Sequence, residues 1–196
     1  MILWLACAFG YYLIGFEIKY LPGNLYMNVI MSTVAEVLAK ITAYSNADRL
    51  GLRKSYYSGL SLALLGCVMI LFSDGRFDSK LVLAMCLFVA KFGIAFTFMI
   101  NYLSITQLFP TLFCGTAAGI CNFAGRMATI FAPMVAEYEP PSPMLILGSM
   151  LLCAFAVSTF LPRARGKPLE GKLTRLAVYK FIRLNINILI IIGGYF

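Results

Sequence analysis

Long apolar runs, separated by short polar segments, dominate this sequence from its first residue to about residue 162. A helix needs about 20 mostly apolar residues to cross the hydrocarbon core of a bilayer. Stretches that can meet this need occupy approximately residues 1–16, 25–45, 57–73, 81–106, 112–135 and 143–162. The segments between them carry Pro, Gly, Asn, Asp and Ser, which favour turns. The pattern predicts an all-α, multi-pass membrane protein with a six-transmembrane-helix bundle over residues 1–162.

The composition indicates lipid as the main solvent of the chain. Of 196 residues, 61% are hydrophobic and 12% are charged, whereas soluble domains average about 45–50% and about 25%. The first apolar run could also be a signal-peptide core, but it lacks a basic leading segment and a clear cleavage site, which favours a spanning helix. The chain has no histidine and no hydrolase motif, so we expect neither an enzyme nor a cofactor. The six cysteines show no regular spacing and are interpreted as packing residues.

Charged residues are distributed unevenly between the two sides of the predicted bundle. The net charge is +8. Segments on one side carry ten basic and two acidic residues, and segments on the other side carry three basic and five acidic residues. Because cytoplasmic segments of membrane proteins are enriched in Lys and Arg, both termini are predicted to be cytoplasmic, with residues 163–196 as a basic cytoplasmic tail. Membrane topology thus accounts for the positive charge, and we expect no nucleic-acid partner.

Four ionisable residues lie inside the predicted spans: Glu36, Lys40, Lys91 and Arg126. A charge at the centre of a transmembrane helix costs about 2.5–3.5 kcal/mol and therefore needs a partner or a watery cavity. At ~1.5 Å per residue, Glu36, Lys91 and Arg126 come out roughly 16, 15 and 14 Å from the outer ends of their helices. This common depth indicates a solute site, and its net positive charge favours an anionic ligand. Glu36 and Lys40 are also four residues apart, so a second interpretation is mutual neutralisation within one helix.

Helical periodicity indicates which residues accompany these charges. Lys91 shares a helix face with Ala95, Phe98 and Tyr102, and Arg126 shares one with Asn122, Gly119 and Gly115. The spacing of Gly115 and Gly119 has an alternative interpretation, the close packing of two helices without any ligand.

Several motifs in order along the chain resemble organic ion transporters of the major facilitator superfamily. They are Tyr11-Tyr12, Glu36-Val37-Leu38-Ala39-Lys40, Asp48-Arg49-Leu50-Gly51-Leu52-Arg53, Lys91-Phe92-Gly93, Gln107-Leu108-Phe109-Pro110-Thr111, Arg126 with Pro133, and Leu161-Pro162 with Gly166-Lys167-Pro168-Leu169. The resemblance extends over about residues 1–170 without obvious gaps. It implies that the chain is similar to helices 7–12 of a twelve-helix carrier, which is half of the superfamily fold.

The resemblance also implies a function and a set of site residues. The anion branch of the family has paired tyrosines, Lys and Arg at the positions of Tyr11 and Tyr12, Lys40 and Arg126. The implied function is that of a secondary carrier at the plasma membrane, which moves small organic ions by alternating access, with anions favoured over cations. Its implied partners are the ion, the lipid bilayer, and an N-terminal half-bundle or a second copy. The complete expected substrate site is Tyr11, Tyr12, Glu36, Lys40, Lys91, Phe98, Tyr102 and Arg126.

A cytoplasmic gate is the second site that the resemblance implies, with Asp48, Arg49, Gly51, Arg53 and Gln107 as its residues. The sequence departs from the family here, because Gln107 stands in place of a Glu and Cys114 in place of an Arg. Both charges of an ion-pair network are therefore missing together. Further departures are Leu38 for a Pro, Leu52 for a frequent Arg, and Arg163 for a Glu.

Two other hypotheses remain open at this point. The chain resembles one half-bundle of a carrier and lacks the opposing bundle, so one alternative is a truncated, non-transporting membrane protein with an interaction or regulatory role. The other alternative is a general sugar or solute carrier of the same superfamily.

Overall fold

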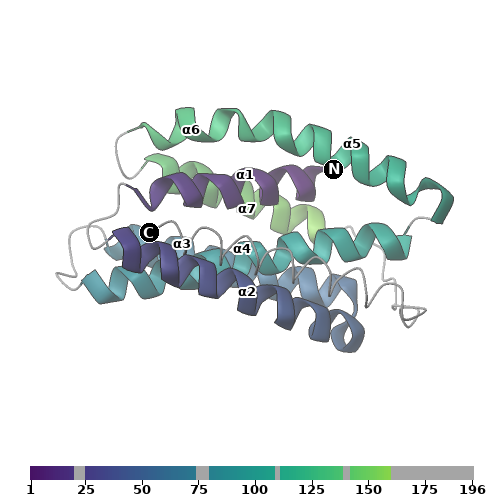
Figure 1. Cartoon of the computed structure of the whole chain (residues 1–196), viewed down its shortest axis with the longest axis horizontal. Helices are drawn as coiled ribbons and strands as arrows, with labels where there is room; N and C mark the ends of the chain where they lie inside the picture. Colours follow the sequence, from purple (N-terminus) through teal and green to yellow (C-terminus); the bar gives the residue numbers. More distant parts are fainter. Residues whose placement is uncertain (20–24, 74–79, 109–110, 139–141, 160–196) are drawn as a thin grey trace.

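The computed structural model describes residues 1–19, 25–73, 80–108, 111–138 and 142–159, which form seven helices and no strands. All of the described helices run roughly along one common axis (Figure 1). The predicted tail, residues 163–196, lies outside the described residues. The helices are α1 (Ile2–Glu17), α2 (Leu25–Leu50), α3 (Leu52–Ser73), α4 (Lys80–Leu108), α5 (Thr111–Thr129), α6 (Phe131–Ala136) and α7 (Ser142–Thr159).

Four of these helices are long and apolar enough to cross a membrane. The qualifying segments are Leu25–Ala47, Leu52–Phe72, Val82–Gln107 and Ser142–Thr159. They match four of the six predicted spans, so the chain is an integral membrane protein, and its described part is all-helical. Helix α1 is apolar but has 16 residues, about 24 Å at 1.5 Å per residue. The spans at 1–16 and 112–135 therefore remain predictions.

Two helix boundaries differ from those expected. The predicted span at 112–135 consists of α5 and α6, with a turn at Ile130 between them. Pro133 explains this break, because it has no N–H to offer the carbonyl group of residue 129. Helix α2 runs on through the predicted break to Leu50, so Gly51 alone separates it from α3. Gly51 has a φ of 77°, a conformation that glycine adopts without a steric penalty and that allows this abrupt reversal.

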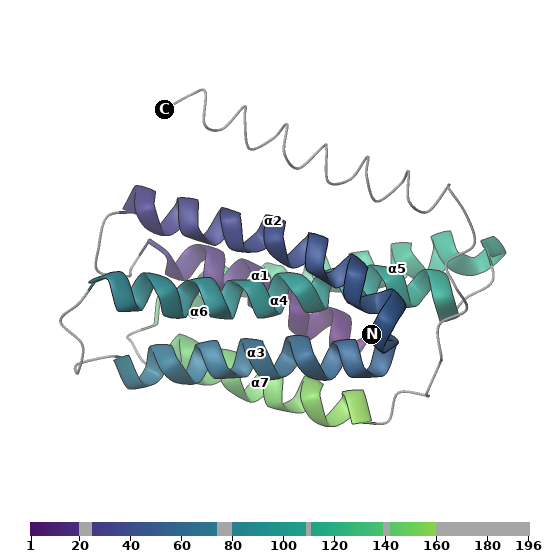
Figure 2. The ribbon, with the colours of Figure 1, turned by 90° about the horizontal axis from the view of Figure 1, so that it is seen from below.

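Helix α4 is the centre of the bundle. It packs against α1, α2 and α3, and α3 also packs against α7; Figure 2 shows α4 between α2 on one side and α3 with α7 on the other. Small residues allow the close contact of α3 with α4. A Cβ atom on Gly66 would overlap the backbone of Ala90, and one on Gly93 would overlap the backbone of Ala63. By contrast, a Cβ on Gly115 or Gly119 would meet no atom within 4 Å in the described structure, so this pair does not mark a close helix contact there.

A buried polar network connects α1, α3 and α4. The Tyr56 hydroxyl donates to Asn101 Oδ1 over 2.6 Å and lies 3.0 Å from Ser104 Oγ. The Asn101 amide in turn donates to the Leu3 carbonyl over 3.4 Å. All three polar side chains are buried, and hydrogen bonding removes most of the cost of burying them.

Helix α2 has the polarity expected of a helix in lipid. Its polar residues Asn28, Ser32 and Lys40 are buried against the bundle. Its large apolar residues are exposed, namely Val29, Ile30, Val34, Leu38 and Ile41. This arrangement would be unfavourable in water, but it is favourable where hydrocarbon surrounds the helix.

The close contact of α3 with α4 generates a matched prediction. Gly66→Ala should destabilise the protein by about 1–3 kcal/mol, because the new methyl group overlaps backbone atoms that cannot rotate away. Gly115→Ala should leave stability unchanged or raise it by up to about 1 kcal/mol, because Ala is the better helix former and space is free. Thermal unfolding of both variants in detergent tests this. Equal stability of the two variants would contradict the packing.

Candidate functional site

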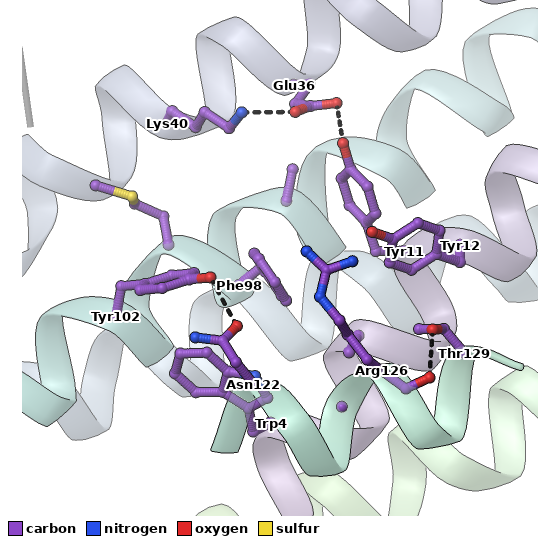
Figure 3. Close-up of a pocket in the computed structure, with 14 residues that line it drawn as sticks. Trp4, Tyr11, Tyr12, Glu36, Lys40, Phe98, Tyr102, Asn122, Arg126 and Thr129 are labelled. Atoms are coloured by element: carbon purple, nitrogen blue, oxygen red, sulfur yellow. Dashed lines mark hydrogen bonds and ion pairs between the residues drawn. The ribbon is translucent and has the colours of Figure 1, made fainter. Parts of the chain in front are cut away.

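A cavity of about 260 Å³ lies between α1, α2, α4 and α5. Fourteen residues line it, and Figure 3 shows their side chains converging from these helices. Seven of them belong to the expected substrate site: Tyr11, Tyr12, Glu36, Lys40, Phe98, Tyr102 and Arg126. The structure thus brings together charges from separate helices that the sequence placed at one depth.

The acidic side of the cavity is a three-residue cluster around Glu36. Lys40 Nζ donates to Glu36 Oε1 over 2.6 Å, which is the ion pair expected from their spacing in α2. The Tyr11 hydroxyl donates to the other carboxylate oxygen, Oε2, also over 2.6 Å. The structure therefore contains the ion pair between Glu36 and Lys40 that the interpretation of mutual neutralisation expects. This interpretation does not account for the whole cluster, because the Glu36 carboxylate also accepts a hydrogen bond from Tyr11 on α1.

Lys91 lies behind this cluster and not in the cavity lining. Its ammonium group donates to the backbone carbonyl of Tyr11 over 3.0 Å and lies 3.7 Å from the centre of the Tyr11 ring. The side chain is almost fully buried. Hydrogen bonding and a cation–π contact both stabilise a desolvated ammonium group. Lys91 therefore holds α1 and the ring of Tyr11 from behind.

Arg126 enters the cavity from α5, and its guanidinium points toward the side of the cavity that carries Tyr11 and Tyr12 (Figure 3). Within the described residues it has no acidic partner, since the ion pair between Glu36 and Lys40 is the only salt bridge there. The cavity lining contains one carboxylate, Glu36, and two cations, Lys40 and Arg126. Its net charge is therefore positive, and the unpaired cation is the one that projects into open space.

Aromatic rings form the remaining wall. Trp4 meets Tyr102 edge-on with the ring centres 4.6 Å apart, and Phe98 stacks on Tyr11 at 5.7 Å. The Tyr102 hydroxyl donates to Asn122 Oδ1 over 3.1 Å. Such rings provide an apolar surface for an organic ligand, while polar groups at the edge orient it.

Sequence reasoning missed half of the lining. Periodicity carried the necessary signal, because Trp4 and Ala8 precede Tyr11 on the same face of α1, and Asn122 and Thr129 flank Arg126 on α5. Gly125 was not recognised either, although a Cβ there would lie 3.1 Å from Trp4 and 3.3 Å from Ala8. The residues missed as site members are Trp4, Ala8, Ala95, Met99, Asn122, Gly125 and Thr129.

The expected cytoplasmic gate is described only in part. The side chains of Asp48 and Arg49 lie outside the described residues. Arg53 donates to the Tyr57 hydroxyl, with Nη2 at 3.2 Å, and lies over its ring. Gln107 keeps a buried side-chain oxygen with no hydrogen-bond partner among the described residues. A gate built from these residues remains a prediction.

Comparison with known proteins gives one consistent group of relatives. No protein-family model matches the chain. The human protein "Solute carrier family 22 member 13" is 30% identical over 176 residues, which cover 88% of this chain and 32% of that protein. Human "Organic cation/carnitine transporter 2" is 25% identical over 179 residues and mouse "Solute carrier family 22 member 4" is 28% identical over 179 residues, each covering 90% of this chain and 32% of the relative.

The chain therefore spans about a third of the length of the relatives that it matches. The matches cover about nine-tenths of the chain itself. Over nearly all of its length, the chain is therefore similar to about a third of the length of organic ion transporters of solute carrier family 22, which belong to the major facilitator superfamily.

Proposed function

We propose that this chain forms the substrate-binding bundle of a secondary carrier for small organic ions, and that it favours anions over cations. The observation that carries the proposal is the Arg126 guanidinium, which enters the cavity without an acidic partner among the described residues. An anionic group beside it would gain a charge-assisted hydrogen bond, with bidentate geometry where the ligand is a carboxylate. A cation in the same place would meet net positive charge. The names of the relatives include both solute carriers and a cation/carnitine transporter, so they support ions in general.

Transport by alternating access would require a second bundle against the open side of the cavity. Carriers of this kind rock two bundles around a site near the bilayer midplane. Helix α5 lines the cavity, and its large apolar residues Ile120, Phe123 and Met127 are exposed. We propose that an N-terminal half-bundle or a second copy of the chain covers this face. The site would then open to one side of the membrane at a time.

The direct test measures ligand binding with a fluorophore that the cavity contains. Trp4 is the sole tryptophan of the chain and lines the cavity. The aromatic carboxylate 2-aminobenzoate accepts energy from tryptophan, so its binding in phosphatidylcholine nanodiscs would be visible as energy transfer from Trp4. Benzoate should displace it, and benzylammonium, which has a similar shape and the opposite charge, should not. Equal displacement by both compounds would argue against anion preference.

Arg126→Ala should weaken the binding of 2-aminobenzoate by about tenfold to a hundredfold, because a hydrogen bond to a charged group contributes about 1.5–3 kcal/mol. The matched control is Lys54→Ala, which removes a cation from an exposed position of α3 outside the cavity lining. That variant should bind normally. Unchanged affinity in Arg126→Ala, in protein that unfolds at the same temperature, would remove Arg126 from the site.

Lys91→Met should weaken the same binding severalfold, and less than Arg126→Ala does. Tyr11 lies between Lys91 and the cavity, so the charge of Lys91 is farther from the ligand than that of Arg126 and attracts it less. The main contribution of Lys91 is to hold the Tyr11 backbone and ring in place. The measurement is again energy transfer from Trp4. A loss equal to that of Arg126→Ala would mean that Lys91 contacts the ligand directly.

We also propose that both termini face the cytoplasm, because the basic segments all fall on one side of the spans. The plasma membrane is proposed as the location because the resemblance to organic ion carriers implies it. An epitope inserted after Tyr138 should then bind antibody on intact cells, since this exposed residue follows α6 on the opposite side. An epitope placed before Met1 should bind only after the cells are permeabilised. The reverse pattern would invert the topology.

A further inference from the structure

The carboxylate of Glu36 stands where the charged group of an anionic ligand would bind. It is held by one ammonium group, Lys40 Nζ, and one phenol, the Tyr11 hydroxyl, each at 2.6 Å. Both donors line the cavity, together with Arg126. An ammonium group and a phenol are the donors that a free carboxylate would also use. Glu36 therefore satisfies, from within the chain, the interactions that a ligand requires.

Several features distinguish this arrangement from an ordinary structural ion pair. Glu36 and Lys40 lie on one helix and need no tertiary contact to meet, yet the carboxylate also bonds to Tyr11 on α1. The side chains of Lys40 and Glu36 are 11% and 16% exposed, so the pair borders the open cavity. Among the described residues that line the cavity, Glu36 is also the only acidic one. Its negative charge acts on any anion bound at Arg126.

We propose that Glu36 is a tethered internal counter-ion, which occupies Lys40 and Tyr11 in the empty cavity and which an anionic ligand must displace to reach them. The inference rests on the proposed function, because it concerns the same cavity. In this mechanism Arg126 makes the first contact with the ligand. The carboxylate of the ligand then competes with Glu36 for Lys40. Glu36 thus lowers anion affinity and keeps Lys40 satisfied when no ligand is bound.

The closing experiment removes the charge of Glu36 and keeps its shape. Glu36→Gln should raise the affinity for 2-aminobenzoate about tenfold, because the negative charge that repels the ligand and competes with it for Lys40 is lost. Glu36→Asp keeps the charge and serves as the control, so its affinity should stay well below that of Glu36→Gln. Binding is measured by energy transfer from Trp4 in phosphatidylcholine nanodiscs, with thermal unfolding as the check on folding.

The outcomes separate this inference from the proposed function. Unchanged or weaker binding in Glu36→Gln, together with a loss in Arg126→Ala, would overturn the counter-ion and keep the anion site. No effect of either substitution on binding would overturn both. Stronger binding in Glu36→Gln and weaker binding in Arg126→Ala would support both.

A second variant covers the case in which Glu36→Gln does not fold. Glu36→Met also removes the charge at nearly the same length, and it carries no polar group that lipid or protein must satisfy. It should likewise bind 2-aminobenzoate more tightly than the unaltered chain. If neither variant folds, the ion pair is a structural requirement that a ligand cannot displace, and the inference is wrong.

Discussion

The ion pair of Glu36 with Lys40, closed by the Tyr11 hydroxyl, is the interaction on which the site depends. A charge among membrane helices is tolerated when it has partners and is costly when it lacks them. These partners come from two helices, so their interaction ties the rotation of α1 to that of α2. Lys91 adds a third helix, α4, through the Tyr11 carbonyl. The electrostatic requirement of one carboxylate thereby sets how three helices face each other.

The two sides of α4 have different roles. Toward α3 it presents Ala90 and Gly93, which allow backbones to approach closely and leave no space for a ligand. Toward α1 and α5 it presents Phe98 and Tyr102, whose rings meet edge-on with their centres 5.4 Å apart and border the cavity. Close packing on one side provides a rigid support, and the bulky rings on the other side leave an open, shaped volume. The cavity is therefore built on the most buried of the four candidate spans.

Charge balance in the cavity connects this architecture to transport. A site with strong, unopposed cations would bind an organic anion tightly and release it slowly. Here one cation, Arg126, has no acidic partner among the described residues, and the other is matched by Glu36. A carrier benefits from such moderation, because binding energy that is the same in every state does not speed turnover. The proposed counter-ion is thus a means of keeping affinity within a useful range.

Much of this molecule could be predicted from the order of its residues. Apolar runs of the right length predicted the four helices that qualify as spans, and the rise per residue placed Glu36 and Arg126 at one depth, where both now border the cavity. Helical periodicity also predicted Phe98 and Tyr102 on one face. These features are local, since each depends on the spacing of residues within one helix.

Other features depended on which helix lies beside which. Lys91 shares its face with Phe98, but α1 crosses at that point and places Tyr11 between Lys91 and the cavity. Gly66 and Gly115 both lie inside helices. Only Gly66 is needed for close packing, because the backbone of a neighbouring helix lies against it and, in the described part of the chain, none lies against Gly115. Periodicity predicts which face of a helix is polar. It does not predict which helix packs against that face, because the apolar contacts that hold helices together have no preferred direction or partner. The tertiary structure decided those partners, and with them which charges reach the ligand.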